Sequence, residues 1–511
     1  MKYIGLIDLG SHEISLSIVN VTAKKQYSLL EKLSRTLAMG ADTYSKSRVS
    51  LDKIKELGEI FSDFSLKLKE YPGIEVLAFA ESAIREAENR SYVLDYLKFL
   101  SGIDVKVLSN NEQVLYQLYS YYDSIEDFDR YIQEGAMFVD LGAGSVQFSL
   151  FLEGKLVSTQ NMRLGSLRLN AVLEELEERS LNFQEYLLEY IWGDLTYFQK
   201  FEGRLRKVKH LFLSGENLTY IRALSHKSAS DFATLNRQDL NKILEDLSDR
   251  SYDYLVRTEH IPEEHARLIL PTALLLREVF RFTGREEAYL PDSPLDKGVF
   301  LRHFAKTYPA LAGRDWSQDQ IDLSRNLAKR YEAEEKHCQQ VEFLSLELFD
   351  ALKKRLRLRP QDRHYLQLAA ILHNVGKFIN IVSEDRRSYD VVRSLEIPGL
   401  SPEELYFIAL VIYFHESDNR QRPEIESNLA PDRQLAMDKL CCLLGLANAM
   451  DTSHQQKIKK IKLDEKQGRM RLALYSKEDI SLELWKLSKE QCFFQEVFST
   501  ELEILTRPYK A

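Results

Sequence analysis

Apolar and polar residues alternate in nearly the same way in two distant stretches of the chain. The first stretch covers residues 3–19 around the turn DLGS at 8–11, and the second covers residues 136–152 around the turn DLGAGS at 140–145. Alternation on both sides of a glycine-containing turn is typical of a β-hairpin. When the two aspartates are aligned, the leucine and glycine that follow them also align. We therefore predict two copies of one hairpin.

The same patterns predict the remaining elements. Apolar runs bounded by turn residues predict strands at Tyr3–Ile7, Ser15–Val21, Ile74–Ala80, Asp104–Leu108 and Leu211–Ser214. Apolar residues at helical spacing predict a helix over Ser50–Leu68, and mainly helical structure follows the last strand as far as about Phe304. Beyond Ala310 strand patterns vanish, and long amphipathic helices are predicted at Asp319–Tyr331, Glu335–Lys354, Tyr365–Leu372, Glu403–Phe414 and Leu435–Ala449.

These elements predict an α/β fold with a duplicated, two-lobed architecture and a cleft between the lobes. We expect the first lobe at residues 1–128 and the second at 129–308. A helical domain is expected at 315–455, after a polar linker near residues 314–318. Alternation returns after residue 458, so the last segment, 456–511, is expected to be a small α/β tail.

Composition narrows the class of protein. The chain has 511 residues, 44% hydrophobic and 29% charged, with a formal net charge of −9 that argues against a nucleic-acid binder. Its longest weakly polar stretch is too short to span a bilayer, and Asp8 interrupts the first apolar run, so we expect neither a membrane partner nor a signal peptide. The four cysteines lack CxxC spacing and are expected to be buried, reduced thiols of a cytoplasmic protein; they are Cys338, Cys441, Cys442 and Cys492.

The hairpin tips carry phosphate-binding chemistry. Glycine lets backbone N–H groups approach a phosphate, and an aspartate beside it can hold a metal ion or water. Two such tips facing each other would hold a phosphate chain from both sides. The segment ESAIRE at 81–86 follows a predicted strand, where ligands bind in open α/β sheets. Arg85 in this segment suits a phosphate, although a structural ion pair is about as good an interpretation.

The order of the motifs resembles one known family. The segments DLGS, ESAIRE, LSNNEQV, DLGAGS, RLGSLRL and LSGEN follow one another as in the exopolyphosphatase and guanosine pentaphosphate phosphohydrolase (Ppx/GppA) family. That family has actin-like, ribonuclease H-like ATPase-type lobes. In the helical half, LHNVGK at 372–377 and LANAMDTSH at 446–454 resemble the family's HD-type domain. The resemblance covers nearly the whole chain.

The resemblance implies Mg²⁺-dependent hydrolysis of a terminal phosphoanhydride, in inorganic polyphosphate or in guanosine pentaphosphate (pppGpp). It also implies a homodimer. Asp140 corresponds to the Mg²⁺ ligand, and hard oxygen donors suit that ion. The residues that correspond to the phosphate-binding positions are Asp8, Gly10, Ser11, Arg85, Gly142, Gly144, Ser145 and Gly215. Glu216 stands where the family has the threonine of an SGT-like turn.

Two departures concern the catalytic carboxylates. Gln113 stands where the family has the glutamate that activates water, and Gln147 stands where it has a second glutamate. Glutamine can orient water but cannot accept its proton, and loss of a general base typically costs about 10²–10⁴-fold in rate. Glu112 is the nearest replacement. However, it is adjacent to Gln113, and neighbouring side chains on a strand or helix point in different directions. His12 is a weaker candidate.

A third departure lies in the HD-like part. His337, His373 and Asp451 match the metal ligands of that domain, but Asn374 stands where an aspartate is expected. An amide is a poor metal ligand beside a carboxylate. Arg387 occupies roughly the place of another histidine. We therefore expect a helical scaffold whose inner polar residues hydrogen-bond one another.

Three functions compete. The first is a hydrolase of the family type with altered or weakened catalysis, and the second is a catalytically inactive sensor that binds polyphosphate or a nucleotide. The third, an actin-like kinase, fits the hairpins but leaves the helical half without a use. Gln113 and Gln147 separate the first two. If these amides limit catalysis, changing both to glutamate raises phosphate release.

Overall fold

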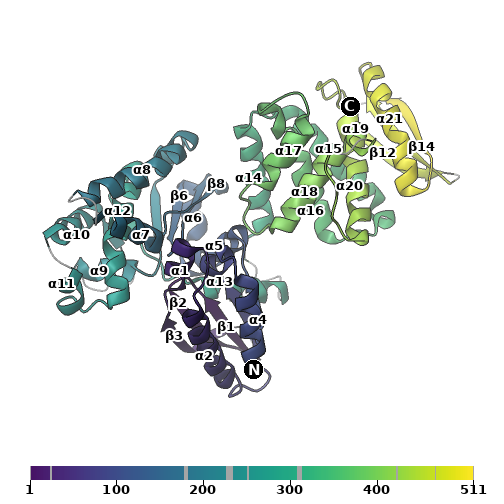
Figure 1. Ribbon diagram of the computed structural model, residues 1–511. Helices are drawn as coiled ribbons and strands as arrows, with labels where there is room; N and C mark the ends of the chain where they lie inside the picture. Colours follow the sequence, from purple (N-terminus) through teal and green to yellow (C-terminus); the bar gives the residue numbers. More distant parts are fainter. Residues whose placement is uncertain are drawn as a thin grey trace. The chain divides into compact units, whose positions relative to one another are not determined.

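The computed structural model describes most of the chain. The residues described are 2–22, 26–177, 182–225, 234–249, 252–307, 313–421, 424–466 and 468–509. They form two compact units, residues 1–315 and 316–511 (Figure 1). Each unit is described by itself.

A five-stranded sheet forms the first lobe. Its strands are β1 (Lys2–Leu9), β2 (Glu13–Val21), β3 (Tyr27–Thr36), β4 (Glu75–Ala80) and β5 (Val105–Val107). Their order is β3-β2-β1-β4-β5. The pairs β1–β2 and β2–β3 are antiparallel, whereas β4 and β5 add to β1 in parallel. The carboxyl ends of the parallel strands therefore lie beside the first hairpin tip.

The second sheet repeats this plan. Its strands are β6 (Ala136–Leu141), β7 (Val146–Leu152), β8 (Lys155–Met162), β9 (His210–Ser214), β10 (Thr234–Asn236) and β11 (Glu287–Tyr289). Their order is β10-β11-β9-β6-β7-β8, with β6–β7 and β7–β8 antiparallel and β9 parallel to β6. Read from β8, the first five strands have the connectivity of the first sheet. The predicted duplicated α/β architecture is confirmed.

Helices accompany both sheets. They are α1 (Met39–Lys46), α2 (Leu51–Leu68), α3 (Ser82–Glu86), α4 (Arg90–Ser101), α5 (Asn110–Ser124), α6 (Phe128–Glu134), α7 (Ser166–Glu177), α8 (Phe183–Phe201), α9 (Leu218–Leu224), α10 (Arg237–Asp249), α11 (Tyr252–Arg257), α12 (Glu263–Thr283) and α13 (Leu295–Thr307). Helix α2 follows the predicted apolar spacing and buries Leu57, Phe61 and Phe64. Helix α13 returns to the first lobe, because Phe300 and Phe304 pack with residues of β1 and β2.

The second unit begins with a helical domain and ends with a small sheet. Its helices are α14 (Trp316–Arg330), α15 (Glu335–Leu356), α16 (Pro360–Leu372), α17 (Glu384–Arg393), α18 (Pro402–Phe414), α19 (Ser417–Gln421) and α20 (Pro431–Ala449). The tail contains β12 (Ile458–Lys466), β13 (Arg469–Ser476), α21 (Ser481–Phe498) and β14 (Leu502–Pro508). All five predicted helices and the α/β tail are confirmed. The domain boundaries near residues 128 and 455 stay predictions.

The sequence patterns missed some strands. Strand β3 escaped because its side chains are mostly exposed, including Leu29 and Leu30, so burial does not alternate along it. Strands β10 and β11 have only three residues each, which is too short for a periodic pattern. The mainly helical structure predicted for that stretch is thus wrong at these two strands.

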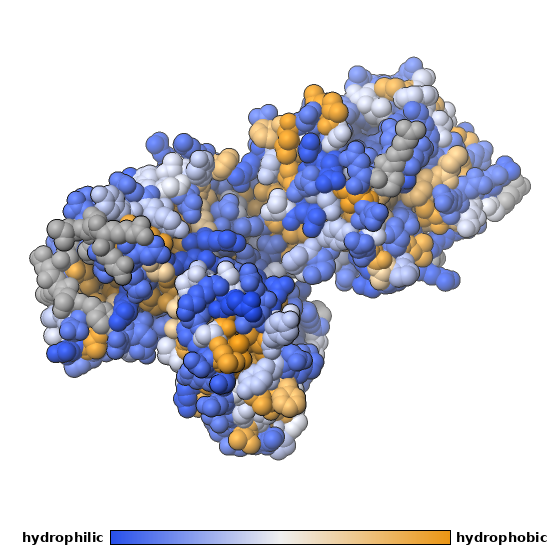
Figure 2. Space-filling model, in the orientation of Figure 1, coloured by the Kyte–Doolittle hydropathy of each residue, from blue (hydrophilic) through white to orange (hydrophobic). Residues whose placement is uncertain are grey.

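The surface is mostly polar on the face seen in Figure 2, with scattered apolar patches. Within the described residues, no helix has both the length and the apolar character that a bilayer crossing requires. The four cysteines are free thiols. Three of them are buried as predicted, but Cys492 is exposed, so that part of the prediction is wrong.

Candidate active site

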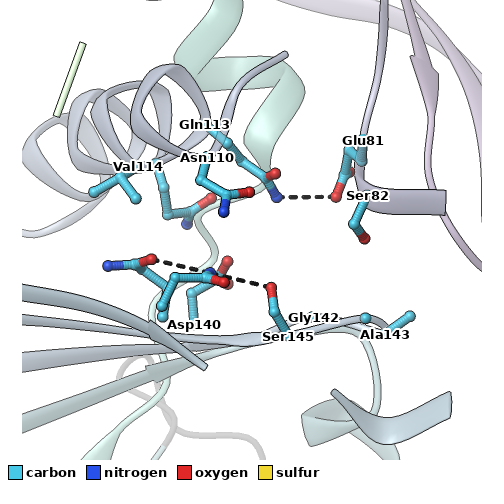
Figure 3. Close-up of a pocket in the computed structure, with 13 residues that line it drawn as sticks. Glu81, Ser82, Asn110, Gln113, Val114, Asp140, Gly142, Ala143 and Ser145 are labelled. Carbon is cyan, nitrogen blue, oxygen red and sulfur yellow. Dashed lines mark hydrogen bonds between the residues drawn. The ribbon is translucent and has the colours of Figure 1, made fainter. Parts of the chain in front are cut away.

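A pocket that is partly open to solvent lies between the two lobes of the first unit (Figure 3). The first lobe contributes the residues that follow β4 and the first turns of α5. The second lobe contributes the β6–β7 hairpin and one residue of β8. The lining residues are Glu81, Ser82, Asn110, Gln113, Val114, Gln117, Asp140, Gly142, Ala143, Gly144, Ser145, Gln147 and Asn161. Both predicted amides and Asp140 therefore face one pocket.

Gly144 lets the second hairpin tip approach the first lobe. A Cβ atom at this position would lie 2.1 Å from the Tyr44 hydroxyl and 2.6 Å from Ser82 Oγ. Tyr44 donates a hydrogen bond to Ser11 Oγ (2.8 Å), and the Ser11 and Ser82 hydroxyls bond each other (2.9 Å). Ser11, predicted to bind phosphate, is thus held in a buried hydroxyl network beside the pocket.

The amino end of α5 points into the pocket. Ser109 caps this helix, because the Glu112 backbone N–H donates to Ser109 Oγ (3.3 Å) and Ser109 N–H donates to Glu112 Oε2 (3.0 Å). Glu112 also pairs with Lys106. The amino end of a helix favours anions. Glu112 is therefore engaged in the helix cap and does not line the pocket.

Gln113 is held between Arg85 and Glu81. Its Nε2 donates a hydrogen bond to Glu81 Oε2 (3.0 Å), while Arg85 Nη1 donates to Gln113 Oε1 (3.3 Å) and to the Leu108 carbonyl (2.8 Å). The contact between Gln113 and Glu81 is drawn in Figure 3. Burial lowers the pKa of Arg85. Arg85, predicted to bind phosphate, positions Gln113 and is not among the lining residues.

Gln147 is fixed by its own sheet. Its Nε2 donates to the Phe148 carbonyl (3.0 Å), and its Oε1 accepts from Asn161 Nδ2 (3.1 Å). Asn161 stands opposite Gln147 in the β7–β8 register and also donates to Ser145 Oγ (3.1 Å). The amide of Gln147 therefore holds this wall of the pocket in place.

Carboxyl groups with raised pKa values concentrate around the pocket. Asp140 Oδ1 accepts a hydrogen bond from Ser214 Oγ (2.5 Å), and burial raises the pKa of Asp140 to about 6. Burial and the neighbouring Glu81 raise the pKa of Asp8, whose Oδ1 is buried without a hydrogen-bond partner. Surrounding protein and acidic neighbours raise the pKa of Glu216 to about 8, although its surface remains accessible to water.

The negative charge of the pocket lining favours binding of a cation. The lining residues include two carboxylates and no lysine or arginine. No group of three histidine, cysteine, aspartate or glutamate side chains that could by itself hold a metal ion occurs in the described part of the chain. Mg²⁺ is commonly held by one or two carboxylates together with water and substrate phosphates. The donor type of Asp140 fits such an ion.

The other predicted residues lie beside the pocket. Asp8, Gly10 and Gly215 are not among its lining residues. Gly215 has φ +141°, and a Cβ atom there would lie 2.5 Å from the Leu141 carbonyl oxygen, so this turn requires glycine. His12 is buried against the His265 ring, and burial lowers its pKa to about 4. Sequence reasoning missed Glu81, although its place directly after β4 was an available signal.

The histidines of the helical domain do come together. His337 Nδ1 lies 2.9 Å from Asp451 Oδ2, and its Nε2 lies 3.2 Å from His373 Nε2. His373 Nδ1 donates to the Ala370 carbonyl (2.8 Å). His415 forms hydrogen bonds with the Ile412 carbonyl and with an asparagine of α20. These mutual contacts match the predicted scaffold.

Known proteins resemble the chain along most of its length. The Ppx/GppA phosphatase family profile matches residues 17–307, and the profile of Ppx/GppA phosphatase domain III matches residues 323–491. A guanosine-5'-triphosphate,3'-diphosphate pyrophosphatase of Aeromonas hydrophila is 19% identical over 438 residues, covering 84% of each chain.

Solved structures show the same fold. An exopolyphosphatase from Cytophaga hutchinsonii superposes with a TM-score of 0.53 at 18% identity, covering 61% of this chain and 99% of that one. An exopolyphosphatase-like protein gives the same TM-score at 16% identity, covering 60% and 98%. The lobes thus have the fold of these solved structures, and the helical unit follows them as domain III. The chain belongs to the Ppx/GppA phosphatase family.

Proposed function

We propose that this protein hydrolyses the terminal phosphoanhydride of inorganic polyphosphate or of guanosine pentaphosphate, with Mg²⁺, in the pocket between its lobes. The observation that carries the proposal is the convergence of the second hairpin tip, the amino end of α5 and Asp140 on that pocket, with the first hairpin tip beside it. Family membership supports this reaction class.

The parts of the pocket have separate tasks. Backbone N–H groups of the Gly142–Ser145 tip and the amino end of α5 bind the phosphate oxygens. The lining carboxylates repel a polyanion, so binding of the substrate requires a cation. Asp140 would hold Mg²⁺, which when bound would neutralise phosphate charge. Gln113 and Gln147 hold the pocket walls and orient the attacking water by hydrogen bonding, as amides do in some phosphohydrolases. Neither amide accepts a proton at neutral pH, so catalysis by these two positions alone is weak.

The relatives differ in the substrate that their names state. The Aeromonas protein is named for guanosine-5'-triphosphate,3'-diphosphate, and the Cytophaga structure is an exopolyphosphatase. Both substrates present a terminal phosphoanhydride, and we propose that this chain hydrolyses at least one of them. A cytoplasmic homodimer completes the proposal.

The test measures turnover and binding together. Orthophosphate release from long-chain polyphosphate and from pppGpp is followed with Mg²⁺ and with EDTA, and polyphosphate binding is measured by equilibrium titration. The proposal predicts Mg²⁺-dependent release from at least one substrate. Binding without any release contradicts it and favours the inactive sensor.

A further inference from the structure

Glu81 is the carboxylate that faces the substituted position. It follows β4 directly and lines the pocket together with Gln113. Gln113 donates a hydrogen bond to Glu81 Oε2 over 3.0 Å. A carboxylate oxygen therefore lies within one hydrogen bond of the position where the family resemblance leads one to expect the base.

The other oxygen of Glu81 faces the first hairpin tip. A Cβ atom built on Gly10 would lie 3.8 Å from Glu81 Oε1, and the Asp8 carboxyl, when protonated, donates a hydrogen bond to the Glu81 carboxylate. A carboxylate has about four acceptor sites, so these contacts leave at least one acceptor site for a water molecule. Glu81 thus lies between the first tip and α5, at the pocket wall opposite the second tip (Figure 3).

The amide at position 113 complements this carboxylate. A glutamate there would bring two negative charges into contact, whereas the glutamine N–H₂ donates to Glu81 and its carbonyl accepts from Arg85. The pair therefore has one carboxylate and one amide in hydrogen-bond contact. The carboxylate is carried by the residue that follows β4, whereas the family resemblance leads one to expect it at position 113 on α5.

We propose that Glu81 is the catalytic base of the hydrolysis described above, so this inference rests on that proposed function. Glu81 accepts a proton from the attacking water as the water oxygen bonds to the terminal phosphorus. The bond from that phosphorus to the bridging oxygen breaks, and the shortened phosphate chain leaves with the electron pair. Gln113 orients Glu81 and is a positioning residue.

The test exchanges the two side chains. Glu81→Gln is expected to lower kcat about 10²–10⁴-fold with a small change in KM, because a general base acts in the transition state. The double variant Glu81→Gln/Gln113→Glu is expected to recover at least tenfold over the single variant, since Arg85 already contacts position 113. Glu88→Gln is the matched control, an exposed glutamate seven positions further along.

A second experiment tests the role of Glu81 without placing an amide at that position. Glu81→Ala removes the carboxylate and opens space in the pocket. Added formate is expected to raise the rate of this variant at least tenfold. Circular dichroism and thermal melting establish that each variant is folded. Formate rescue depends on a proton acceptor and does not follow from a purely structural role.

The possible outcomes separate the two proposals. Absence of phosphate release by the parent protein overturns the proposed function and this inference with it. If the parent is active and Glu81→Gln keeps its rate, only the base assignment is overturned. The base assignment is also overturned if the variants are folded and inactive, the exchange does not rescue Glu81→Gln and formate does not rescue Glu81→Ala. Recovery in either experiment supports it.

Discussion

The cleft and the helical domain both carry amides where the family resemblance predicts carboxylates, but the surroundings of these amides differ. In the cleft, Gln113 bonds with both Glu81 and Arg85, and it lines a solvent-connected pocket. In the helical domain, Asn374 is buried and its Nδ2 has no hydrogen-bond partner. His337 and Asp451 of the same domain are fully buried and bond each other.

The comparison shows that one kind of substitution has two consequences. In the cleft a second carboxylate contacts the new amide, so negative charge is retained near the pocket. In the helical domain the Nδ2 group of Asn374 has no hydrogen-bond partner among the described residues, and His337 bonds with His373 and Asp451. The first region keeps a carboxylate in contact with its amide, whereas the polar groups of the second are buried and bond one another.

The largest predicted effect is on catalysis in the cleft. Asp140→Asn removes the negative donor that we propose for Mg²⁺, and phosphate release is expected to fall at least about 10³-fold, equivalent to about 4 kcal/mol. Initial rates over a Mg²⁺ titration measure it. A variant with parental rate and Mg²⁺ dependence would remove Asp140 from the proposed site.

The same substitution is expected to stabilise the folded protein without metal. Burial raises the pKa of Asp140 from 3.8 to about 6, which costs the charged folded state up to about 3 kcal/mol. This cost is absent below about pH 4 and fully present above about pH 6, because only the ionised carboxyl is disfavoured. In EDTA, denaturant unfolding should show a stability gain for Asp140→Asn that grows across this range. A gain independent of pH would contradict this cause.

A restored carboxylate in the helical domain should harm stability and leave catalysis unchanged. Asn374→Asp puts a charge at a position that is 4% exposed, beside groups that already bond one another. We expect about 2 kcal/mol of destabilisation, from the cost of an unpaired buried group. Phosphate release should keep its parental rate. An increase in activity with Mn²⁺ or Zn²⁺ would indicate a metal site and end the contrast between the two regions.

A restored carboxylate in the cleft should lower activity when Glu81 is present. Gln113→Glu brings two carboxylates into contact, and we expect about a tenfold fall in rate, equivalent to about 1.4 kcal/mol. Parallel assays of Gln113→Glu and Gln113→Glu/Gln147→Glu measure this effect. A strong rise in either variant would mean that the amides limit catalysis and that Glu81 does not replace the lost base.

The sequence predicted the parts of the site that depend on local pattern. Glycine turns between alternating strands identified both hairpins, and Asp140, Gly142, Gly144 and Ser145 indeed face one pocket. Glu81 was not among the predicted site residues, because its contact with Gln113 depends on how β4 and α5 come together in space. Ser11 was predicted to bind phosphate, but its hydroxyl accepts a hydrogen bond from Tyr44 on α1. No pattern in the sequence indicates that Tyr44 lies beside Ser11.

The most direct test of a working cleft follows oxygen from water into product. The parent protein is incubated with Mg²⁺ and polyphosphate or pppGpp in ¹⁸O-enriched water, and the released orthophosphate is examined by mass spectrometry. Attack by water on the terminal phosphorus predicts orthophosphate that carries one ¹⁸O atom, at a rate that falls strongly in Glu81→Gln. Substrate binding without labelled orthophosphate would contradict the account.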